Sequence, residues 1–564
     1  MRLILRDFCN GFCFTQPRQI RKNNVVRMSN TTVEEMAEAF KEMGTSFIVG
    51  HPGGESVELM DAAKNLGIRF ILMKQEVAGA MLAATWGEIT GAPGVCLSTR
   101  GPGATNMVNG IAHAFLDRAP LIAITDRYSA PEQEIGLRQK LDQRAILQPM
   151  VKWSTTIEAK VIKQQLRRAV RVATSHAPGP VHFDLPQSET KKPAGDLPNL
   201  PDLMPNHYHP APDPRALDAA VTMIKSAQRP VLLAGLGVLW DNASDAMLAF
   251  AEHLGTPVLT TSKCKGAIAE DHPLRAGCII GGLIERNLVA KADLIITIGL
   301  DAVELQPKGW PYSTPVLSLA TLPSLDALVA SEQEVIGNLG HIVTALQTLL
   351  PAGAGWGFEV AADFRQRVIT ALDTPADGLS PQRAVELARQ ALPRETIATC
   401  DAGASRLLVV QKWQSYGPRE FLTSNGLGSM GYAVPGALAA RIAYPDRPVI
   451  AFTGDGGLMM AVAELQTSVR ENLPVIILVF DDGEIGLIRT KQSIKGIDPY
   501  GVHLGGIDWE SLARGFGAEG VTVNSEQTLI SALEYALKNN TTTVIGVKID
   551  ASGYVEQFKA LREL

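Results

Sequence analysis

Two acidic turns near the C-terminal end of the chain have the residue types and spacing of a magnesium and phosphate site. The turn Gly454-Asp455-Gly456-Gly457 follows an apolar run, Val449 to Phe452, and the turn Asp481-Asp482-Gly483-Glu484 follows a second apolar run, Val475 to Phe480. Apolar runs of this length are typical of parallel strands covered on both faces. Leu458 to Asn472, between the two turns, has the periodicity of a helix.

In such a right-handed strand–helix–strand unit both strands end at the same edge of the sheet, so Asp455 and Asp482 should lie close together. Two neighbouring carboxylates repel each other unless a cation lies between them. Mg²⁺ prefers carboxylate and phosphate oxygens, and the free N–H groups of a helix that begins after Gly457 attract an anion. We therefore predict a site for Mg²⁺ and a diphosphate. The residues alone also allow a simpler interpretation, in which these are ordinary glycine-aspartate turns.

The elements that position these turns belong to an alternation of strands and helices along the whole chain. We expect an amphipathic helix from Thr32 to Met43, with Thr32 as N-cap and Glu35 completing a capping box. Further helices are expected at residues 77–89 and from the Gly101-Pro102-Gly103 turn to about Leu116. Short strands are expected at residues 46–49, 70–73, 94–98, 120–125, 230–234, 257–260, 294–298, 315–319 and 396–399. The predicted fold class is α/β, with doubly wound parallel sheets whose functional turns follow the strands.

Length and proline content divide the chain into three such domains. A chain of 564 residues is long enough for several domains. Residues from about 190 to 213 are rich in proline, as in an interdomain linker. We predict a basic leader at 1–28, a first domain at 29–190, a linker at 191–212, a central domain at 213–350, a second linker at 351–380, a third domain at 381–550 and a tail at 551–564.

Charge, hydropathy and cysteine content restrict the class of protein. A net charge of −6 gives no sign of a nucleic-acid partner, and no apolar run has the length of a membrane span. The six cysteines are few and scattered, which is typical of reduced thiols and a cytoplasmic protein. Residues 1–27 contain several basic residues and a single acid, Asp7. This composition fits a transit peptide, or an untidy leader or upstream start before Met28.

Other enzyme classes find little support in the sequence. There is no G-x-S-x-G elbow, no Walker lysine loop and no zinc-type histidine spacing. Gly235-Leu236-Gly237 hints weakly at nucleotide binding, so a nucleotide-binding dehydrogenase is the alternative from patterns alone. Such an enzyme needs a G-x-G-x-x-G turn after the first strand of a domain, and that turn is missing.

Several motifs, taken in order, resemble a known family. Gly454-Asp455-Gly456 followed by Asp481-Asp482 resembles the thiamine diphosphate motif, which begins with Gly-Asp-Gly and ends with Asn-Asn. Four other stretches look like the acetolactate synthase-like branch (large or catalytic subunit) of these enzymes: Gly50-His51-Pro52-Gly53-Gly54, Gln75-Glu76, Gly101-Pro102-Gly103-Ala104-Thr105-Asn106 and Gly426-Leu427-Gly428-Ser429-Met430-Gly431-Tyr432. The resemblance covers about residues 30 to 550. It implies a pyrimidine-binding, a central and a diphosphate-binding domain, with active sites between the chains of a homodimer or homotetramer.

The resemblance also implies roles for single residues. Glu76 would hydrogen-bond the aminopyrimidine N1′ of thiamine diphosphate and so assist loss of the thiazolium C2 proton, and Gln139 aligns with an active-site glutamine. Met430 would hold the cofactor bent, and Gly428 would offer its carbonyl to the 4′-amino group. Mg²⁺ would be bound by Asp455, Asp482 and the backbone oxygen of Glu484, although Asn is usual at position 482. The other cofactor-binding residues implied are Gly53, Gly54, Ala402, Gly403, Ser405, Gly454, Gly456, Gly457 and Ile485.

Departures from the family pattern bear on the choice of substrate. The paired histidines of pyruvate decarboxylase-like members are absent, and only His113 is present, which argues against simple aldehyde release. Biosynthetic acetolactate synthases have a tryptophan at Lys491 and arginines within the segment 301–305, which here reads Asp-Ala-Val-Glu-Leu. These residues select the acceptor and steady a flavin, so both the acceptor and FAD are in doubt. Arg489 and Lys491 could bind another acidic acceptor or be solvated surface residues. Lys152 aligns with a lysine near the substrate entrance, or is an ordinary surface lysine.

We therefore expect a thiamine diphosphate- and Mg²⁺-dependent carboligase. It would decarboxylate a 2-oxo acid such as pyruvate and transfer the resulting acyl unit to an acceptor, with acetolactate formation as the named case. The alternatives are a decarboxylase or lyase of the same cofactor class, a ligase with an unusual acceptor, and a non-catalytic homologue. The presence of Glu76 and of the metal ligands argues against the last of these.

Overall fold

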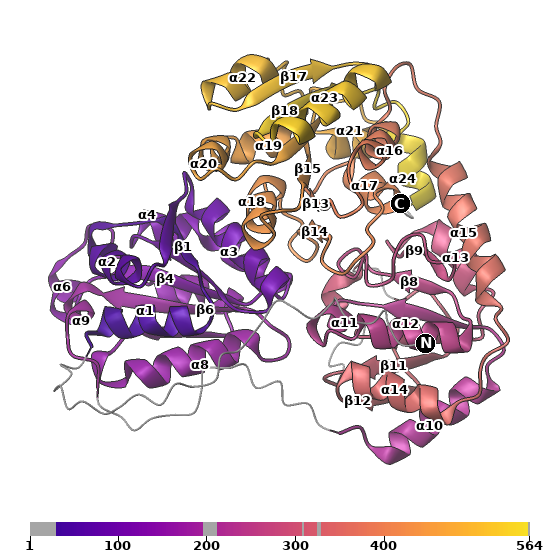
Figure 1. The fold of residues 1–564 in the computed structure, drawn as a ribbon, viewed down its shortest axis with the longest axis horizontal. Helices are drawn as coiled ribbons and strands as arrows, with labels where there is room; N and C mark the ends of the chain where they lie inside the picture. Colours follow the sequence, from indigo (N-terminus) through magenta and orange to yellow (C-terminus); the bar gives the residue numbers. More distant parts are fainter. Residues whose placement is uncertain (1–29, 196–210, 307–309, 324–328, 562–564) are drawn as a thin grey trace, which may run out of the picture.

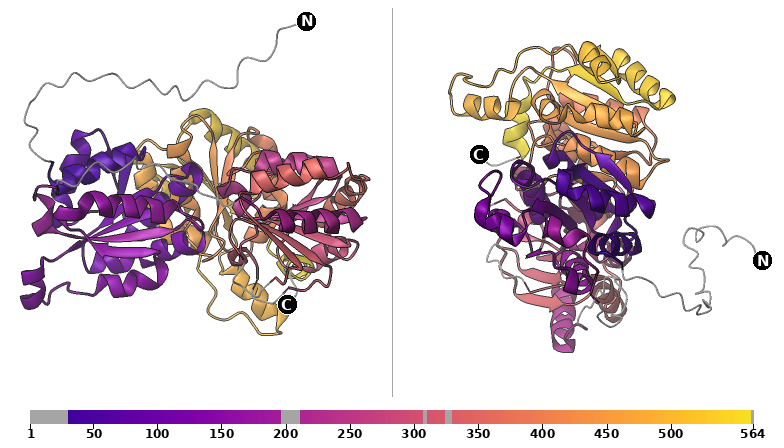
Figure 2. Two further views of the ribbon diagram at one scale, coloured as in Figure 1. Left: turned by 90° about the horizontal axis from the view of Figure 1, so that it is seen from below. Right: turned by 90° about the vertical axis from the view of Figure 1, so that its left-hand side faces the viewer.

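The computed structural model describes residues 30–195, 211–306, 310–323 and 329–561, which form three α/β domains (Figures 1 and 2). Each domain has one six-stranded sheet, and all neighbouring strands within the sheets are parallel. Helices cover both faces of the sheets (Figure 1). The predicted fold class is confirmed. Among the described residues, no helix combines the length and the apolar character needed to cross a membrane.

The N-terminal domain has the strand order β2-β1-β3-β4-β6-β5. Its strands are β1 (Phe47–His51), β2 (Arg69–Leu72), β3 (Gly94–Ser98), β4 (Leu121–Arg127), β5 (Trp153–Thr156) and β6 (Pro180–Pro186). Its helices are α1 (Thr32–Glu42), α2 (Val57–Asn65), α3 (Glu76–Thr90), α4 (Pro102–Asn106), α5 (Val108–Leu116), α6 (Ala130–Ile135), α7 (Gln143–Leu147), α8 (Ile162–Thr174) and α9 (Gln187–Thr190). The turns after β1 and β3 therefore lie at one edge of the sheet, as the parallel topology requires.

The central domain has the strand order β12-β11-β10-β7-β8-β9. Its strands are β7 (Pro230–Ala234), β8 (Val258–Thr260), β9 (Arg275–Cys278), β10 (Leu294–Ile298), β11 (Val316–Ala320) and β12 (Gln333–Ile336). Its helices are α10 (Pro214–Ser226), α11 (Gly237–Trp240), α12 (Ser244–Leu254), α13 (Leu283–Val289), α14 (Leu339–Leu349) and α15 (Gly357–Leu372). Helix α15 packs on β9, where a Cβ atom at Gly277 would lie only 2.6 Å from the ring of Phe364.

The third domain has the strand order β14-β13-β15-β16-β18-β17. Its strands are β13 (Ile397–Cys400), β14 (Phe421–Thr423), β15 (Val449–Gly454), β16 (Ile476–Asp481), β17 (Glu519–Val523) and β18 (Thr543–Lys548). Its helices are α16 (Pro381–Ala391), α17 (Arg406–Lys412), α18 (Ala433–Ala443), α19 (Asp455–Ala461), α20 (Glu464–Arg470), α21 (Gly486–Ile494), α22 (Trp509–Gly515), α23 (Glu526–Asn539) and α24 (Tyr554–Leu561). The apolar strands β15 and β16 form the buried centre of this sheet.

The N-terminal and third domains of one chain meet through α3 and α18, which lie side by side where the indigo and orange parts of Figure 1 adjoin. Both helices are composed mainly of small buried residues, chiefly alanine and glycine. Small side chains let two helix backbones approach closely, so the contact is broad and apolar. One buried hydroxyl pair, Thr85 and Tyr432, lies within it at 3.3 Å.

Several local predictions need correction. The capping box of α1 is formed by Thr31 and Glu34, one residue before the predicted pair Thr32 and Glu35. The single helix predicted for residues 458–472 is two helices, α19 and α20, and the first already begins at Asp455. The helix predicted to run to Leu116 is also divided, at Met107.

The connecting segments are more structured than their composition indicates. The predicted second linker, residues 351–380, contains the whole of α15, and the predicted tail, residues 551–564, contains α24. The leader at 1–28 and most of the proline-rich linker at 191–212 lie outside the described residues. The domain boundaries themselves remain predictions.

Candidate active site

The two predicted acidic turns lie together at the carboxyl edge of the third sheet. β15 pairs with β16 so that Gly454 stands opposite Phe480. Asp455 and Asp482 therefore leave neighbouring strands at the same level. The backbone N–H of Gly483 donates to Asp455 Oδ2 at 2.8 Å, which joins the two turns directly.

The electrostatics of this edge favour a bound cation. Burial raises the pKa of Asp455 above its ordinary value. Burial, and then the charge of Asp455, raise the pKa of Asp482 to about 7. Two desolvated carboxylates that repel each other are stabilised by a divalent ion with oxygen preference. Among the described residues no three His, Cys, Asp or Glu side chains gather as a metal site, so two carboxylates would need backbone and phosphate oxygens to complete the shell.

Glu484 can contribute only its backbone oxygen to such an ion without losing other contacts. Its side chain is held by Arg489, with Nε 2.8 Å from Oε2, and by His503, with Nδ1 3.0 Å from Oε1. Arg489 is therefore paired within the turn region, whereas Lys491 is exposed on α21. Arg489 is half-buried, and its guanidinium forms an ion pair with an acid of its own chain.

Asp401, directly after β13, joins the start of α18 to the end of β15. Its Oδ1 accepts the backbone N–H groups of Tyr432 at 2.6 Å and Ala433 at 2.8 Å, and its Oδ2 accepts the hydroxyl of Thr453 at 2.6 Å. A Cβ atom at Gly457 would lie 2.5 Å from Asp401 Oδ2, so any larger residue there would force Asp401 to shift. Burial raises the pKa of Asp401 to about 6.

The loop from Ser424 to Gly431 reaches the same turn. The methyl group of Met430 lies 3.4 Å from where a Cβ atom at Gly456 would be, which places Met430 over the Gly-Asp-Gly turn. Gly428 has a φ of +66°, a left-handed conformation that favours glycine. The structure therefore brings Met430 next to Gly456, and the cofactor roles predicted for Gly428 and Met430 stay predictions.

Asp117, which follows α5, holds this loop by hydrogen bonds to its backbone. Asp117 Oδ1 accepts the backbone N–H groups of Asn425 at 2.7 Å and Gly426 at 3.2 Å. Nδ1 of His113 lies 3.0 Å from Asp117 Oδ2 and 3.1 Å from the hydroxyl of Ser424. His113 is fully buried. His113 therefore supports the loop through Ser424 and Asp117.

The remaining predicted diphosphate residues belong to segments that follow β13 and β16. The segment Ala402 to Ser405 follows β13, and Ile485 precedes α21. A Cβ atom at Gly486 would lie 2.7 Å from Asp482 Oδ2, 3.5 Å from the Cβ of Ala404 and 3.6 Å from the ring of Tyr554. Tyr554 belongs to α24, the segment predicted as a tail. Burial first, and then Asp482 and Asp455, raise the pKa of its hydroxyl far above the usual range.

A second group of predicted residues surrounds the Gly101-Pro102-Gly103 turn of the N-terminal domain. Asn106 donates a hydrogen bond to Glu76 Oε2, and a Cβ atom at Gly103 would lie 3.2 Å from Glu76 Oε1. A Cβ atom at Gly101 would lie 3.0 Å from the Cβ of Gln139. The turn therefore separates Glu76 on one side from Gln139 on the other.

Gly53 lies at the same edge, after β1, whereas Gly54 is exposed beside it. A Cβ atom at Gly53 would lie 2.6 Å from Asp126 Oδ2 and 2.5 Å from the hydroxyl of Thr99. No hydrogen bond or ion pair between described residues of one chain joins Glu76 or Gln139 to Asp455 or Asp482. The candidate residues thus belong to two groups, one on the N-terminal domain and one on the third domain, which we call half-sites.

Comparison with known proteins finds matches to one family in all three domains of the chain. Thiamine pyrophosphate enzymes match in three parts: their N-terminal TPP binding domain at residues 30–146, their central domain at 217–346 and their C-terminal TPP binding domain at 401–547. A probable acetolactate synthase large subunit of Methanocaldococcus jannaschii is 31% identical over 546 residues, covering 92% of this chain and 91% of that protein. The chain belongs to the thiamine pyrophosphate enzymes.

Two further relatives align over a similar extent. A probable acetolactate synthase large subunit of Methanococcus aeolicus is 30% identical over 552 residues, with 92% of each chain covered. The acetolactate synthase of Bacillus subtilis is 27% identical over 544 residues, covering 93% of this chain and 94% of that protein. The similarity to the acetolactate synthase-like branch that the motifs indicated is thereby confirmed.

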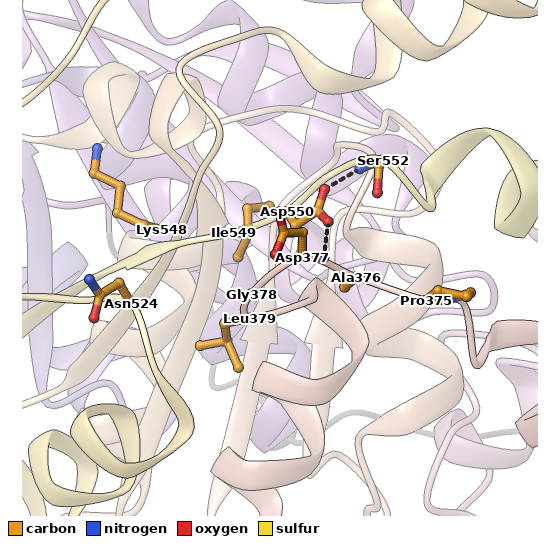
Figure 3. A pocket seen from close by; sticks show the side chains of 10 residues that line it. All are labelled: Pro375, Ala376, Asp377, Gly378, Leu379, Asn524, Lys548, Ile549, Asp550 and Ser552. Atoms are coloured by element: carbon orange, nitrogen blue, oxygen red, sulfur yellow. Dashed lines mark hydrogen bonds between the residues drawn. The ribbon is translucent and has the colours of Figure 1, made fainter.

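Other polar residues of this thiamine pyrophosphate enzyme join segments of the chain to one another. Nζ of Lys152 donates to the carbonyls of Ser175 and Ala177, each at 2.8 Å, so it fastens the segment before β6. A groove at the carboxyl end of β18 is lined by residues 375–379 and 548–550, together with Asn524 and Ser552 (Figure 3). Within it, the carboxylate of Asp550 accepts hydrogen bonds from the N–H groups of Asp377 at 2.6 Å and Ser552 at 2.9 Å. It therefore joins the segment before α16 to the segment after β18.

The sequence did not reveal three of the residues that build the site. No role was predicted for Asp401, Asp117 or Tyr554. A signal existed for Asp401 alone, because an acid directly after a buried strand is the same pattern that identified Asp455 and Asp482. The roles of Asp117 and Tyr554 depend on contacts between segments that are distant in the chain.

Proposed function

We propose that this enzyme is a thiamine diphosphate- and Mg²⁺-dependent carboligase of the acetolactate synthase type. It would decarboxylate a 2-oxo acid, pyruvate first, and transfer the acyl unit to an acceptor, which makes it a transferase. The observation that carries the proposal is the similarity to acetolactate synthases over more than nine-tenths of both chains. All three domains are included, and with them both half-sites.

The residues present fit the cofactor and its ion. The oxygens of Asp455 and Asp482, with the backbone oxygen of Glu484, would hold Mg²⁺, and the N–H groups at the start of α19 would face the diphosphate. When bound, thiamine diphosphate would supply a carbon nucleophile for the carbonyl of the 2-oxo acid and an electron sink for the loss of CO₂. Met430 and the carbonyl of Gly428 would set the conformation and the amino group of its pyrimidine.

Glu76 would act as the proton-handling group at N1′ of the pyrimidine. A carboxyl beside a nitrogen base can share a proton with it and thereby change the basicity of the amino group across the ring. The hydrogen bond from Asn106 holds Glu76 Oε2 and leaves Oε1 for this partner. Gln139, across the glycine turn, would contact the substrate.

The resemblance to thiamine diphosphate enzymes, whose active sites lie between two chains, supports a homodimer as the minimal active unit. Glu76 of one chain would then meet Asp455 of its partner, and two such centres would form per dimer. A homotetramer of two dimers and a cytoplasmic location remain predictions. Gel filtration coupled to light scattering, together with mixed dimers of Glu76→Gln and Asp455→Ala chains, tests the shared site. Mixed dimers with one fully native centre should recover up to half of the native activity.

The described residues of the central domain are unsuited to FAD. A cavity of about 280 Å³ lies at the carboxyl edge of its sheet, and among the described residues that line it Arg118 is the one arginine or lysine. Both carboxylate oxygens of Asp301 already bind Arg118, at 3.0 and 3.3 Å. The N–H of Leu236, in the glycine turn where a phosphate would be expected, donates instead to the buried Glu304 at 2.9 Å. A dinucleotide diphosphate would meet carboxylates there, so we propose that the enzyme works without flavin.

A carboligase with another acidic acceptor is the second candidate. The exposed Lys491 on α21, directly after the acidic turn, favours it. Lys491→Ala should then raise KM for the acceptor and leave donor decarboxylation unchanged.

Product analysis tests these proposals together. The purified enzyme, with Mg²⁺ and thiamine diphosphate but no FAD, is incubated with pyruvate, and the products are identified by mass spectrometry. Acetolactate supports the first proposal, and acetaldehyde alone indicates a decarboxylase. Consumption of pyruvate only when a second acidic compound is added supports the other acceptor. No consumption of any 2-oxo acid in a panel would indicate a non-catalytic homologue.

A further inference from the structure

The turn that leads into Glu76 is held by a buried carboxylate of another domain. Glu464, the first residue of α20, accepts the backbone N–H of Lys74 at 3.0 Å and that of Gln75 at 3.1 Å, both at its Oε1. Gln75 is the N-cap of α3, and its side chain makes no capping hydrogen bond. These two N–H groups lie just before α3 rather than in its first turn, so Glu464 holds the residues that lead into the helix carrying Glu76, and we call this contact the inter-domain cap.

The contact is enclosed and specific. Glu464 is 1% exposed, and the hydroxyl of Thr467 donates to its Oε2 at 2.7 Å. A buried carboxylate is costly unless it receives hydrogen bonds, and here two backbone N–H groups and one hydroxyl provide them. Burial raises the pKa of Glu464 above its ordinary value. The cap is thus an interaction that neither domain can lose without leaving polar groups unpaired.

A second contact from α20 holds the same turn. Arg470, at the other end of that helix, donates to the carbonyl of Leu72, the last residue of β2. The turn between β2 and α3 is therefore fixed at both ends by α20, by a carboxylate on its N–H groups and by a guanidinium on its carbonyl. Glu76 directly follows the fixed residue Gln75, so its Cα lies only about 3.8 Å from that of Gln75.

We propose that Glu464 is a positioning residue, which sets the place and direction of Glu76 by holding the two residues before α3 from the third domain. This inference rests on the proposed function of Glu76. It adds that the geometry of the pyrimidine half-site is determined by α20, the helix that follows the Asp455 helix α19 in the chain. A displacement of about 1 Å in a reacting group can cost about 100-fold in rate, which is the effect expected when the cap is lost.

Two variants separate position from charge. Glu464→Gln keeps the length of the side chain and an acceptor oxygen but removes the charge. Glu464→Asp keeps the charge but withdraws the acceptor by one methylene. Positioning predicts that Glu464→Gln keeps kcat within about 5-fold of the wild type, whereas Glu464→Asp loses about 100-fold, each with little change in KM for pyruvate. Glu534→Ala, on the exposed face of α23, is the matched control and should behave as the wild type.

Amide hydrogen exchange of the cofactor-free protein gives a readout that does not depend on turnover. The amides of Lys74 and Gln75 should exchange at least about 10-fold faster in Glu464→Asp than in the wild type, and near the wild-type rate in Glu464→Gln. Equal exchange in all variants, or full kcat in Glu464→Asp with a defect in Glu464→Gln, would overturn the inference. Glu76→Gln serves as the reference. If it keeps turnover, the proposed function of Glu76 fails, and if it is inactive while both Glu464 variants are normal, only the positioning role fails.

Discussion

Removal of one buried lysine should weaken the contacts between all three domains and lower the free energy of unfolding. Lys263 of the central domain lies 2.6 Å from Glu88 Oε1 and 3.5 Å from Asp117 Oδ1, and it donates to the carbonyl of Thr423 at 3.3 Å. Glu88 belongs to α3, and Thr423 ends β14 of the third domain. Lys263 is 1% exposed at its side chain, Glu88 7% and Asp117 0%. Lys263→Met removes the cation from two buried carboxylates.

The magnitude follows from what the substitution leaves behind. Burial lowers the pKa of Lys263, but Glu88 and Asp117 outweigh it and raise the pKa above its ordinary value. Burial likewise raises the pKa of Asp117, while Lys263 and His113 outweigh it and bring the pKa well below its usual range. Breaking a buried ion pair by removing one partner costs about 3–5 kcal/mol, because a charge stays buried without compensation. We expect Lys263→Met to lower the free energy of unfolding by that amount.

Urea unfolding followed by circular dichroism measures the loss, and an exposed pair provides the control. Arg383 and Glu526 form an ion pair at 2.8 Å with side chains 38% and 52% exposed, so Arg383→Met should cost less than about 1 kcal/mol. The double variant Lys263→Met/Glu88→Gln should recover part of the lost stability, because one uncompensated charge is removed. Thiamine diphosphate should also bind more weakly to Lys263→Met, since Asp117 holds the loop that carries Gly428. A cost for Lys263→Met no greater than that for Arg383→Met would refute the reasoning.

Four other predictions follow from the geometry of the site. Glu76→Gln should lower kcat at least about 100-fold, while calorimetry shows cofactor binding close to wild type. Asp455→Ala should lose Mg²⁺-dependent retention of thiamine diphosphate on gel filtration. Gly457→Ala should lower stability by about 1–3 kcal/mol in urea, because its Cβ would lie 2.5 Å from Asp401 Oδ2. Asp126→Asn should stabilise the protein more at pH 8 than at pH 5. Burial raises the pKa of Asp126 in the folded state from 3.8 to about 7, so the stability that its neutral form contributes is full below about pH 4 and lost as the pH rises to about 7. Asn is neutral at every pH and avoids that loss.

Each of these has an outcome that contradicts it. Undiminished turnover in Glu76→Gln would remove the residue from the reaction. Cofactor that stays bound to Asp455→Ala after chelation would show that another residue holds the ion. A Gly457→Ala variant as stable as the wild type would mean that Asp401 can move aside at no cost. Parallel melting curves of wild type and Asp126→Asn between pH 5 and 8 would show that Asp126 does not titrate in that range.

Much of the fold could be predicted from the sequence because its signals are local. The buried strands β3, β7 and β10 were placed at their observed bounds, since each is a continuous apolar run between turns. Strands with polar or exposed residues, such as β5 and β17, were not predicted. The pattern of α19 and α20 could not show the break between them, because both helices share one apolar face.

The site was predictable only where topology alone brings residues together. Asp455 and Asp482 follow adjacent parallel strands, so their proximity required no knowledge of side-chain packing. Glu464 and Lys263 were not singled out, because their partners lie in other domains and no local pattern distinguishes them from solvated charges. The assignment of Glu76 came from a resemblance, and its contact with Asn106 became visible only in the folded chain.

The close contact between α3 and α18 has a consequence for protein engineering. Each helix presents small residues to the other across a domain border, and Tyr432 at the start of α18 reaches Thr85 of α3. A chimera that takes its N-terminal domain from a relative would import a different α3 and leave α18 unchanged. Crossover points for recombination between relatives should therefore keep α3 and α18 from the same parent, even though about 350 residues of sequence separate them.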